Sequence, residues 1–423
     1  MEFGFAAADE EFRAEARSWL AEHLTGPFAA SVGRGGPGSE HEDSAQRRAW
    51  ERELGRGGWI GIGWDSDAYG NRRATLTQQV VWAEEYARVG APGRYGHIGE
   101  NLLAPTLLAY GTQEQRDEFL PPIARGDALW CQGYSEPGAG SDLAGLRTAA
   151  VRDGDAYRIS GQKVWTSLAH DADWCFVLAR TEEGSQGHHG LSFLLVPMDQ
   201  PGRIEVRPIR QLTGTSEFNE VFFDGARARS AHVVGGEGNG WRVAMGLLGF
   251  ERGVSTLVQQ IGFAEELGGV LREAVAGGAA DDPVLRDRLV RQWAELRVMR
   301  WNALRTLGGS GSGSGSASAS ASEKGGSSEK GGGQGDAGAP SVAKLLWGRW
   351  HQRLGELAMS VRGAAATVGP SDWSEASPYE LDALQRLFLF TRADTIYGGS
   401  DEIQRNIIAE RVLGLPREAR GPR

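Results

Sequence analysis

Residues 133–142 read GYSEPGAGSD and separate two parts of the chain that follow different sequence patterns. The residues before this stretch follow the period of helices, and those after it follow the pattern of short strands. Its glycines and proline favour a tight turn between two domains. Glycines also let backbone N–H groups approach a ligand closely and face inward together. The stretch therefore predicts a boundary between an α and a β region, with a ligand site as the alternative interpretation.

The part before the boundary carries helical signals. Residues 9–24 place apolar side chains on one face of a helix, with acidic residues in the first turn, and residues 76–89 also read as a helix. Thr112 and Gln115 form a capping box for a further helix, which we expect to end against Pro121 and Pro122. These signals predict an all-α N-terminal domain over residues 1–125.

The part after the boundary reads as strands. Short apolar runs occur at 174–179 and 191–196, and Ile204 and Val206 alternate with polar residues. Asp-Gly, Pro-Gly and glycine-rich breaks separate these runs. Asp153 and Gly154, between apolar stretches, give the clearest hairpin signal. Residues 126–235 are therefore predicted to form a β domain.

The helical pattern returns at about residue 236 and predicts a bundle of four or five long helices in residues 236–423. Asp282 and Pro283 start one helix, and Ser377, Pro378 and Glu380 combine an N-cap, an N1 proline and a capping box for another. A third is expected from Ser341. Its expected apolar side consists of Leu345, Leu346, Trp350, Leu354, Leu357 and Val361.

Residues 308–340 interrupt the predicted bundle. Of these 33 residues, 12 are Gly, 9 are Ser and 5 are Ala, a composition that cannot bury a core. A flexible chain of this length reaches roughly 30 Å, which suffices to join adjacent antiparallel helices. The cost of closing such a loop grows only logarithmically with its length. The segment is predicted to be a flexible linker.

Deleting most of this linker is expected to leave activity and the melting temperature nearly unchanged. The physical reason is that the segment can contribute little buried surface to the folded state. Activity assays and thermal unfolding of the deletion variant and the full chain measure the two quantities side by side. A large loss of either quantity would instead assign the linker a binding role.

Composition excludes several classes of protein. The formal net charge is −10, so no charge-driven partnership with nucleic acid is expected. Two cysteines, Cys131 and Cys175, are too few for a disulfide framework or a multi-cysteine metal site. The acidic start lacks a basic, apolar leader, and no run approaches the roughly 18 apolar residues of a membrane span. A soluble, cytoplasmic protein is expected.

Three further segments suit chemistry, although each also has a purely structural interpretation. GQKVWTS at 161–167 sets an indole beside two hydroxyls, where a tryptophan alone would more often pack in a core. Glu251 and Arg252 follow a nearly uncharged stretch. A carboxylate facing an apolar cleft has a raised pKa and can act as a base. A Glu-Arg dipeptide alone is more often a solvated pair. Tyr397 and two glycines lead into a helix capped by Ser400, whose first N–H groups could polarise a carbonyl or bind phosphate.

Four segments together carry a family resemblance: SEPGAGSD at 135–142, SGQKVWTS at 160–167, GWRVAMG at 240–246 and SDEIQR at 400–405. In this order and at this spacing they make the chain resemble the acyl-CoA dehydrogenase family over nearly its full length. The resemblance implies an α+β multidomain fold with an N-terminal all-α domain, a middle β-barrel-like domain and a C-terminal four-helix bundle. It also implies bound FAD and α,β-dehydrogenation of an acyl thioester to the trans-2-enoyl thioester.

The resemblance assigns the catalytic base to Glu251. In the family the base lies either just after the tyrosine of the C-terminal turn or just before the arginine on the first helix of the bundle. Gly398 occupies the first position here and Glu251 the second, so the chain is similar to the isovaleryl-CoA and long-chain type. The Gly398 backbone N–H is implied to stabilise the enolate oxygen while hydride passes to flavin N5.

The other implied contacts fall in the same segments. Ser167 is implied to hydrogen-bond near flavin N5, Trp165 to cover the dimethylbenzene side of the ring, and Arg252 to brace the acyl-CoA site. The implied cofactor residues are Gln132, Tyr134, Ser135, Ser141, Trp165, Thr166, Ser167, Ser400 and Glu402, and the implied substrate residues are Ser141, Arg252 and Gly399.

Two family motifs that hold the adenosine diphosphate part of FAD across subunits are missing. Residues 276–283 read AGGAADDP instead of carrying Arg-x-x-Phe, and residues 362–366 read RGAAA instead of Gly-Gly-x-Gly. Losing that arginine removes a charge-assisted contact worth about 1.5–3 kcal/mol. We therefore favour a heteromer, similar to actinobacterial steroid and fatty-acid enzymes in which a related second chain completes the FAD site, over a homo-oligomer.

Other interpretations stay open at this stage. A non-catalytic structural partner of a sister subunit is one, although such a chain would have no reason to keep Glu251 where Gly398 has lost a base. An acyl-CoA oxidase, which lets dioxygen reach the reduced flavin, is another. The thioester could be carried by CoA or by an acyl-carrier protein, and electron-transfer flavoprotein is the expected acceptor. Chain length, branching or a steroid nature of the acyl group does not follow from the sequence.

Overall fold

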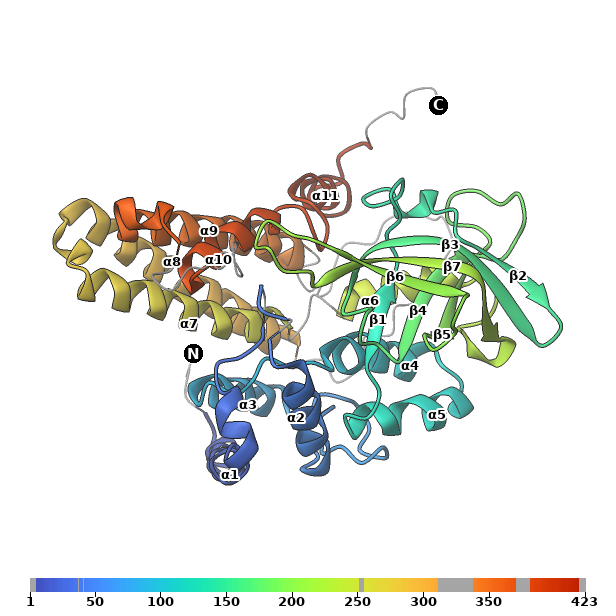
Figure 1. Ribbon diagram of the computed structural model, residues 1–423, viewed down its shortest axis with the longest axis horizontal. Helices are drawn as coiled ribbons and strands as arrows, with labels where there is room; N and C mark the ends of the chain where they lie inside the picture. Colours follow the sequence, from blue (N-terminus) through green and yellow to red (C-terminus); the bar gives the residue numbers. More distant parts are fainter. Residues whose placement is uncertain are drawn as a thin grey trace. The chain divides into compact units, whose positions relative to one another are not determined.

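The structure, a computed structural model, describes residues 5–36, 38–40, 42–250, 255–310, 338–369 and 381–417. The chain divides into two compact units, Met1–Ser255 and Thr256–Arg423. The first unit contains helices and one sheet, and the second unit contains helices (Figure 1). This order of N-terminal helices, a sheet and C-terminal helices confirms the expected fold class.

The helices of the first unit begin where the sequence provides caps. The Thr112 hydroxyl accepts from Gln115 N at 3.3 Å, and the Thr112 N–H donates to Gln115 Oε1 at 3.1 Å, which confirms the capping box. Thr75 and Gln78 cap a second helix in the same way. The helices described in this unit are α1 (Ala7–His23), α2 (Ser44–Arg56), α3 (Leu76–Arg88), α4 (Ala104–Tyr110), α5 (Gln113–Ala124) and α6 (Gly240–Phe250).

Helix α5 differs from its prediction at the C-terminal end. Pro121 and Pro122 lie inside the helix, so the expectation that they end it is wrong. Proline lacks a donor but keeps its carbonyl. The N–H of Arg125 donates to Pro121 O at 3.0 Å and that of Asp127 to Pro122 O at 2.9 Å. The proline carbonyls therefore close the last turn, which ends at Ala124.

The strands form one twisted sheet whose two ends stay apart. Its order is β6-β7-β3-β2-β4-β5-β8, and β1 pairs in parallel with β4. Strand β8 pairs with β5 and, among the described strands, not with β6, so the sheet is open rather than closed into a barrel. The strands are β1 (Trp130–Gly133), β2 (Ala149–Asp153), β3 (Ala156–Ser167), β4 (Trp174–Arg180), β5 (Leu191–Pro197), β6 (Ile204–Ile209), β7 (Phe218–Arg229) and β8 (Val233–Val234).

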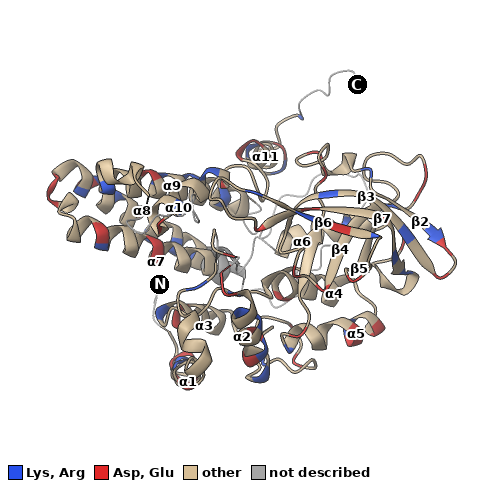
Figure 2. Cartoon of the chain, viewed as in Figure 1, with Lys and Arg blue, Asp and Glu red and all other residues tan. Residues whose placement is uncertain are grey.

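The predicted hairpin and buried strands are confirmed. Asp153 pairs with Ala156 across a tight turn in which Gly154 adopts φ +65°, a conformation that glycine takes without strain. Strands β4 and β5 are buried on both faces, as continuous apolar runs require. Figure 2 shows them almost free of charged residues, whereas charges of both signs are interspersed over the helices.

Alternate residues of β4 and β5 face two different cores. Phe176 and Phe193 stack at 5.5 Å in a cluster that also contains residues of α4, α5 and α6. Val177 and Leu194 point the other way and pack with residues of β3 and β7, such as Val221. Strands β4 and β5 therefore pack against helices on one face and against β3 and β7 on the other.

The second unit is a bundle built around α9. The buried side chains include Leu267, Val270, Leu296, Trp350, Leu354 and Leu357. The Asp282 carboxylate accepts from Val284 N at 2.7 Å, which confirms the predicted start at Pro283. The helices are α7 (Ser255–Ala276), α8 (Pro283–Ser310), α9 (Ala339–Arg362), α10 (Ala383–Phe390) and α11 (Asp401–Ile407).

Several predicted boundaries in this unit shift. Helix α8 continues to Ser310 and α9 begins at Ala339, so both ends of the predicted 308–340 linker are helical, and residues 311–337 lie outside the described residues. Ser377, Pro378 and Glu380 also lie outside them, and Asp382 caps the described part of α10. Along α9 the expectation that Leu346 is buried is wrong, because the helix turns Trp347 toward Phe263 of α7 and leaves Leu346 48% exposed.

In the parts of the chain that the structure describes, no helix combines the length and the apolarity needed to cross a lipid bilayer.

Candidate functional site

A buried lysine fastens the glycine-rich loop to the sheet. Lys163, on β3, is fully buried, and its Nζ donates to Glu136 Oε1 at 2.8 Å, to Leu178 O at 2.8 Å and to Tyr134 O at 3.0 Å. An ammonium has three N–H donors, and these three oxygens accept all of them. The geometry therefore fits a charged lysine that bonds two residues of the loop to β3 and β4.

Glu136 completes this buried ion pair. Its carboxylate also accepts from the backbone N–H groups of Arg147 at 2.6 Å and Thr148 at 2.9 Å. Burial alone would raise the pKa of Glu136, but the Lys163 ammonium and these hydrogen bonds hold the pKa below its usual value. Both residues stand inside the segments quoted above, but the sequence does not reveal their pairing, because a lysine and a glutamate in loops and strands are usually solvated.

The same loop runs beside the segment that contains Trp165. Val164 N donates to Ser135 O at 2.9 Å, which brings Ser135 next to residues 164–167. The pairing of β3 with β7 is irregular between Lys163 and Thr166, and Trp165 there has φ +61°. A left-handed conformation costs a non-glycine residue roughly 1–2 kcal/mol. The bulge presents the indole outward, 58% exposed, with an edge-on contact to Phe218 at 6.1 Å.

The hydroxyl groups around this indole differ in access. Ser141 is exposed and Ser167 is half-buried, whereas Thr166 is fully buried and its Oγ1 has no hydrogen-bond partner among the described atoms. The difference between Thr166 and Ser167 follows from successive residues facing opposite sides of a strand, whereas Ser141 lies in the loop after β1. A cofactor role for Thr166 would therefore use its backbone, while the two serines can offer their side chains.

Gln132 and Tyr134 lie on and just after β1. Gln132 is half-buried. The Tyr134 ring is buried and packs edge-on against Phe176 at 5.9 Å and Phe193 at 6.3 Å. The ring of Tyr134 is thus part of the sheet core, and its backbone carbonyl is bound by Lys163.

These features fit a flat aromatic cofactor such as the expected flavin. The indole of Trp165 is open to a ring system, and Ser141 and Ser167 can hydrogen-bond beside it. A Cβ atom at Gly138 or Gly140 would meet no described atom within 4 Å, so the loop backbone is accessible. The buried Lys163–Glu136 pair attaches this glycine-rich loop to β3. The residues present are compatible with FAD.

The second unit contains the C-terminal turn. Gly398 and Gly399 have φ +64° and +84°, both in the left-handed region, where glycine is unstrained. Gln404 Nε2 donates to Gly398 O at 3.3 Å and to Gly399 O at 3.2 Å. The Ser400 hydroxyl accepts from Ile403 N at 3.4 Å and caps α11, which confirms the predicted cap. The turn therefore has a defined backbone conformation.

Glu402 has a simple structural explanation in this turn. It lies in the first turn of α11 and is mainly exposed, with a contact to Arg405 at 3.3 Å. Its own backbone N–H and the Ser400 hydroxyl lower the pKa of Glu402. Such an acidic residue suits the positive end of a helix with or without a ligand. Its cofactor role stays a prediction.

The two remaining predicted residues, Glu251 and Arg252, lie outside the described residues, just after the end of α6 at Phe250.

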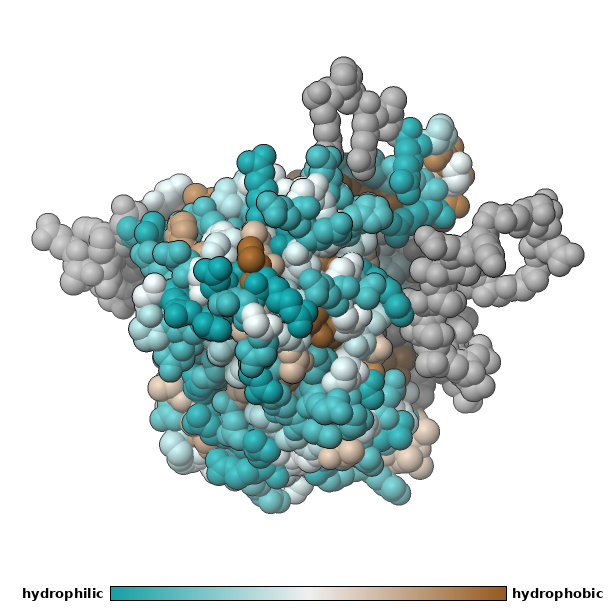
Figure 3. Space-filling model, turned by 90° about the vertical axis from the view of Figure 1, so that its right-hand side faces the viewer, coloured by the Kyte–Doolittle hydropathy of each residue, from teal (hydrophilic) through white to brown (hydrophobic). Residues whose placement is uncertain are grey.

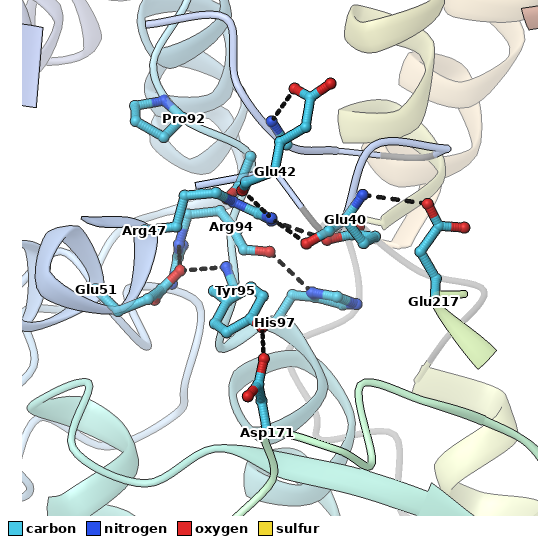
Figure 4. Close-up of polar contacts among 12 residues, drawn as sticks. Glu40, Glu42, Arg47, Glu51, Pro92, Arg94, Tyr95, His97, Asp171 and Glu217 are labelled. Carbon is cyan, nitrogen blue, oxygen red and sulfur yellow. Dashed lines mark hydrogen bonds and ion pairs between the residues drawn. The ribbon is translucent and has the colours of Figure 1, made fainter. Parts of the chain in front are cut away.

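A second buried charge cluster, missed from the sequence, joins segments within the first unit (Figure 4). Arg94 donates to both carboxylate oxygens of Glu51 at 2.9 Å and to Glu100 at 2.6 Å. Burial alone would raise the pKa of Glu51, but the Arg94 guanidinium outweighs burial and lowers it. The Tyr95 hydroxyl donates to Asp171, in the segment between β3 and β4. The cluster fastens α2 and the segment before α4 to this connection, and every contact drawn is internal to the protein.

Family models match the chain in three consecutive stretches. The model described as "Acyl-CoA dehydrogenase, N-terminal domain" matches residues 6–127, "Acyl-CoA dehydrogenase, middle domain" matches 131–226, and "Acyl-CoA dehydrogenase, C-terminal domain" matches 238–413.

Two curated relatives match nearly the whole chain. Acyl-CoA dehydrogenase IpdE1 of Mycobacterium tuberculosis is 55% identical over 97% of this chain and 99% of its own length. Acyl-CoA dehydrogenase IpdE1 of Mycolicibacterium smegmatis is 53% identical, again over 97% of this chain and 99% of its own.

Two solved structures are also similar. The "Tcur3481-Tcur3483 steroid ACAD" is 29% identical with a TM-score of 0.79, and the alignment covers 99% of this chain and 100% of that one. The ChsE4-ChsE5 complex from Mycobacterium tuberculosis is 31% identical with a TM-score of 0.74, with coverage of 99% and 100%.

Proposed function

This chain belongs to the acyl-CoA dehydrogenase family, and from that premise we propose that it oxidises an acyl thioester between its α and β carbons to the trans-2-enoyl thioester. Members of this family are FAD-dependent flavoproteins. When bound, FAD supplies the acceptor for the hydride that leaves the β-carbon. The remaining steps of the proposal concern residues of this chain.

One observation carries the proposal: the glycine-rich loop and the exposed Trp165 are held together at the end of β3. The Ser135–Val164 backbone hydrogen bond and the buried Lys163–Glu136 pair support this arrangement from inside. Burial of the indole does not explain the strained backbone of Trp165, since the indole is 58% exposed and its described ring contact is to Phe218 alone. Strain of this kind is characteristic of ligand-binding positions.

The proposed proton chemistry assigns Glu251 as the base that removes the α-proton. A carboxylate of raised basicity typically contributes a factor of about 10² to 10⁴ in rate to such a step. Gly398 is assigned the backbone N–H that stabilises the developing enolate oxygen, a role that needs no side chain. Arg252, Ser141 and Gly399 are assigned to the thioester, in line with the family pattern.

The proposed cofactor contacts are shared between side chains and backbone. Ser167 is assigned a hydrogen bond to the flavin near its reactive nitrogen, and Trp165 the ring face. Ser141 is assigned a contact with both ligands because its hydroxyl is exposed. The other proposed contacts are made by Gln132, Tyr134, Ser135, Thr166, Ser400 and Glu402.

The names of similar structures indicate a class of acyl group to test. The names of two similar structures describe them as steroid ACADs, at 29% identity. We therefore propose bulky, ring-containing acyl-CoA thioesters as the first substrates to test against straight-chain ones. Electron-transfer flavoprotein as the acceptor and a cytoplasmic location are further parts of this proposal.

We also propose that a second, related chain completes the FAD site. Two similar structures have names that join two proteins, ChsE4-ChsE5 and Tcur3481-Tcur3483. Helix α8 carries exposed apolar side chains: Val284, Val290, Trp293, Val298 and Trp301. By contrast, the face drawn in Figure 3 is mainly hydrophilic, with isolated apolar residues. Several large exposed apolar residues on one helix favour a protein partner.

Expressed alone, the chain is expected to bind less than one FAD per chain and to show little turnover. The reason is the missing arginine and glycine turn that hold the adenosine diphosphate part in homo-oligomeric members. Flavin absorbance of the purified protein, together with dye-linked turnover, measures both quantities. Stoichiometric FAD with full dehydrogenase turnover by the chain alone would contradict the heteromer.

The oxidase alternative is separated by one further measurement. An oxidase lets dioxygen react with the reduced cofactor, whereas a dehydrogenase excludes it. Stopped-flow reoxidation in air, compared with reoxidation by an electron-transfer flavoprotein, therefore distinguishes the two activities.

A further inference from the structure

Asp394 lies at the centre of a buried polar cluster below the C-terminal turn. Asp394 is fully buried, and both of its carboxylate oxygens are engaged. Oδ1 accepts from the Tyr397 hydroxyl at 2.6 Å, and Oδ2 lies 2.8 Å from His351 Nδ1. The backbone oxygen of Asp394 accepts from Lys344 Nζ at 2.6 Å. Asp394 thus links Lys344 and His351, both on α9, to Tyr397, which begins the turn.

His351 holds this carboxylate as a cation. Its other ring nitrogen, Nε2, lies 2.7 Å from Glu266 Oε2 of α7. Two ionised carboxylates accept but do not donate, so both ring nitrogens must carry a proton. Burial alone would lower the pKa of His351, but Glu266 and Asp394 outweigh burial and raise it to about 9. At neutral pH the ring is therefore an imidazolium between two carboxylates.

Lys344 brings a second cation to the same turn. Its Nζ lies over the ring of Trp347 at 3.8 Å and over that of Tyr397 at 4.6 Å. A Cβ built on Gly398 would lie 3.7 Å from this Nζ. His351 pairs with both carboxylates, so removing it leaves the buried Asp394 carboxylate without its counter-ion.

The turn itself is held on its other side by different contacts. Gln404 donates to the carbonyls of Gly398 and Gly399, and Asp401 N donates to Thr395 O at 3.0 Å. These bonds come from α11, whereas the Asp394 cluster reaches the turn from α7 and α9. The two glycines alone would allow many conformations, because glycine has little backbone preference of its own. Their defined geometry therefore depends on both sets of contacts.

We propose that Asp394, held by His351 and Lys344, is a positioning residue that orients the Tyr397–Gly399 turn for stabilisation of the thioester enolate. This inference rests on the proposed function, because the Gly398 N–H is the assigned donor. A donor of this type acts through its preset direction, and loss of one such donor costs roughly 10² to 10³ in rate. Loosening the turn should remove part of that factor without removing the donor.

The proposal has a pH signature. The ionisable groups facing His351 are Glu266 from α7 and Asp394 from the segment before the turn, and Phe263 and Trp350 supply uncharged ring contacts. Because the folded pKa of His351 is raised, its stabilising contribution is complete below the ordinary pKa of about 6.5 and declines as pH rises. It is lost as pH passes about 9, where a neutral ring can donate to only one carboxylate. The turn then loosens, and kcat falls.

The test compares Asp394→Asn and His351→Gln with the wild type in the FAD-loaded, catalytically active protein. If a sister chain is needed for activity, the full chain is assayed together with it. In Asp394→Asn we expect kcat to fall about 10- to 100-fold with KM changed less than about threefold, a fraction of the effect of a lost oxyanion donor. Amide hydrogen exchange of residues 395–400 should accelerate in both variants. In His351→Gln the decline of kcat near pH 9 should disappear.

Gln292→Leu is the matched control. Gln292 of α8 donates to the backbone oxygen of Trp350, the residue before His351 on α9, at 2.6 Å. It has no contact to the turn among the described residues. We expect it to lower the melting temperature while kcat, its alkaline decline and exchange of the turn stay unchanged. Asp394→Asn behaving like this control, or wild-type kcat without an alkaline decline, would overturn the proposal.

The measurements also separate the two levels of inference. If the wild-type assembly oxidises no acyl thioester, the proposed function is wrong, and hydrogen exchange of the turn still tests the positioning role. If turnover is present but exchange in the turn is the same in all variants, the positioning role is wrong and the proposed function stands. Should Asp394→Asn not fold, His351→Gln and the wild-type pH profile carry the same test.

Discussion

Glu251→Gln is expected to abolish turnover, with a loss of at least about 10² to 10⁴ in kcat, while FAD content stays unchanged. Glutamine keeps the size of the side chain but cannot accept the α-proton of the thioester. Gly398 provides no side chain that could replace the lost carboxylate. Anaerobic bleaching of the flavin after addition of acyl-CoA reports the step directly, and dye-linked turnover gives kcat.

Glu265→Gln serves as the control for this variant. Glu265 is an exposed residue of α7, so removal of its charge should leave kcat within about twofold, as surface substitutions usually do. Full activity of Glu251→Gln would show that another group removes the proton. Inactivity accompanied by loss of FAD would indicate instead that residue 251 supports the fold.

Lys163→Met is expected to give the largest loss of stability, about 3–5 kcal/mol, together with weaker FAD binding. The substitution leaves the Glu136 carboxylate buried without its counter-ion and leaves Tyr134 O and Leu178 O without their donor. The glycine-rich loop then loses its attachment to β3. Denaturant unfolding gives the change in free energy, and flavin absorbance after gel filtration gives the retained cofactor.

Arg158→Met on the same strand is the matched control. Arg158 pairs with Asp153 at 3.5 Å, but both side chains are about half exposed, and exposed pairs contribute at most about 1 kcal/mol. This variant should keep both stability and FAD. Equal behaviour of the two variants would mean that the buried Lys163–Glu136 pair does not hold the loop. A double variant, Lys163→Met with Glu136→Leu, should regain stability because no unpaired charge is left buried.

Local patterns predicted most of the elements correctly. The capping box at Thr112, the hairpin at Gly154 and the start at Pro283 were confirmed because each depends on residues within a few positions of one another. The apolar runs of β4 and β5 were confirmed for the same reason. Where local rules competed with packing, as at Pro121 and Leu346, the prediction was wrong.

Closure of the sheet was not a local property either. The barrel-like expectation came from the family resemblance, whereas in the described chain β6 and β8 are the ends of the strand order and do not pair with each other. The linker boundaries differed because α8 and α9 extend into the glycine- and serine-rich segment by a few residues at each end. Terminal turns of helices follow their neighbours as much as their own propensity.

The amino-acid sequence by itself determined the family, the order of helices and sheet, and the types of residue available for catalysis. It did so because four short segments keep their order and spacing, and because helix and strand periods are local. Only the tertiary structure decided that Lys163 is a buried cation, that Trp165 is turned outward on a strained bulge, and that Asp394 joins His351, Lys344 and Tyr397. The contacts of Lys163, Lys344 and His351 join residues that are distant in the sequence and share a low-dielectric interior, where a charge is stable only beside its partner.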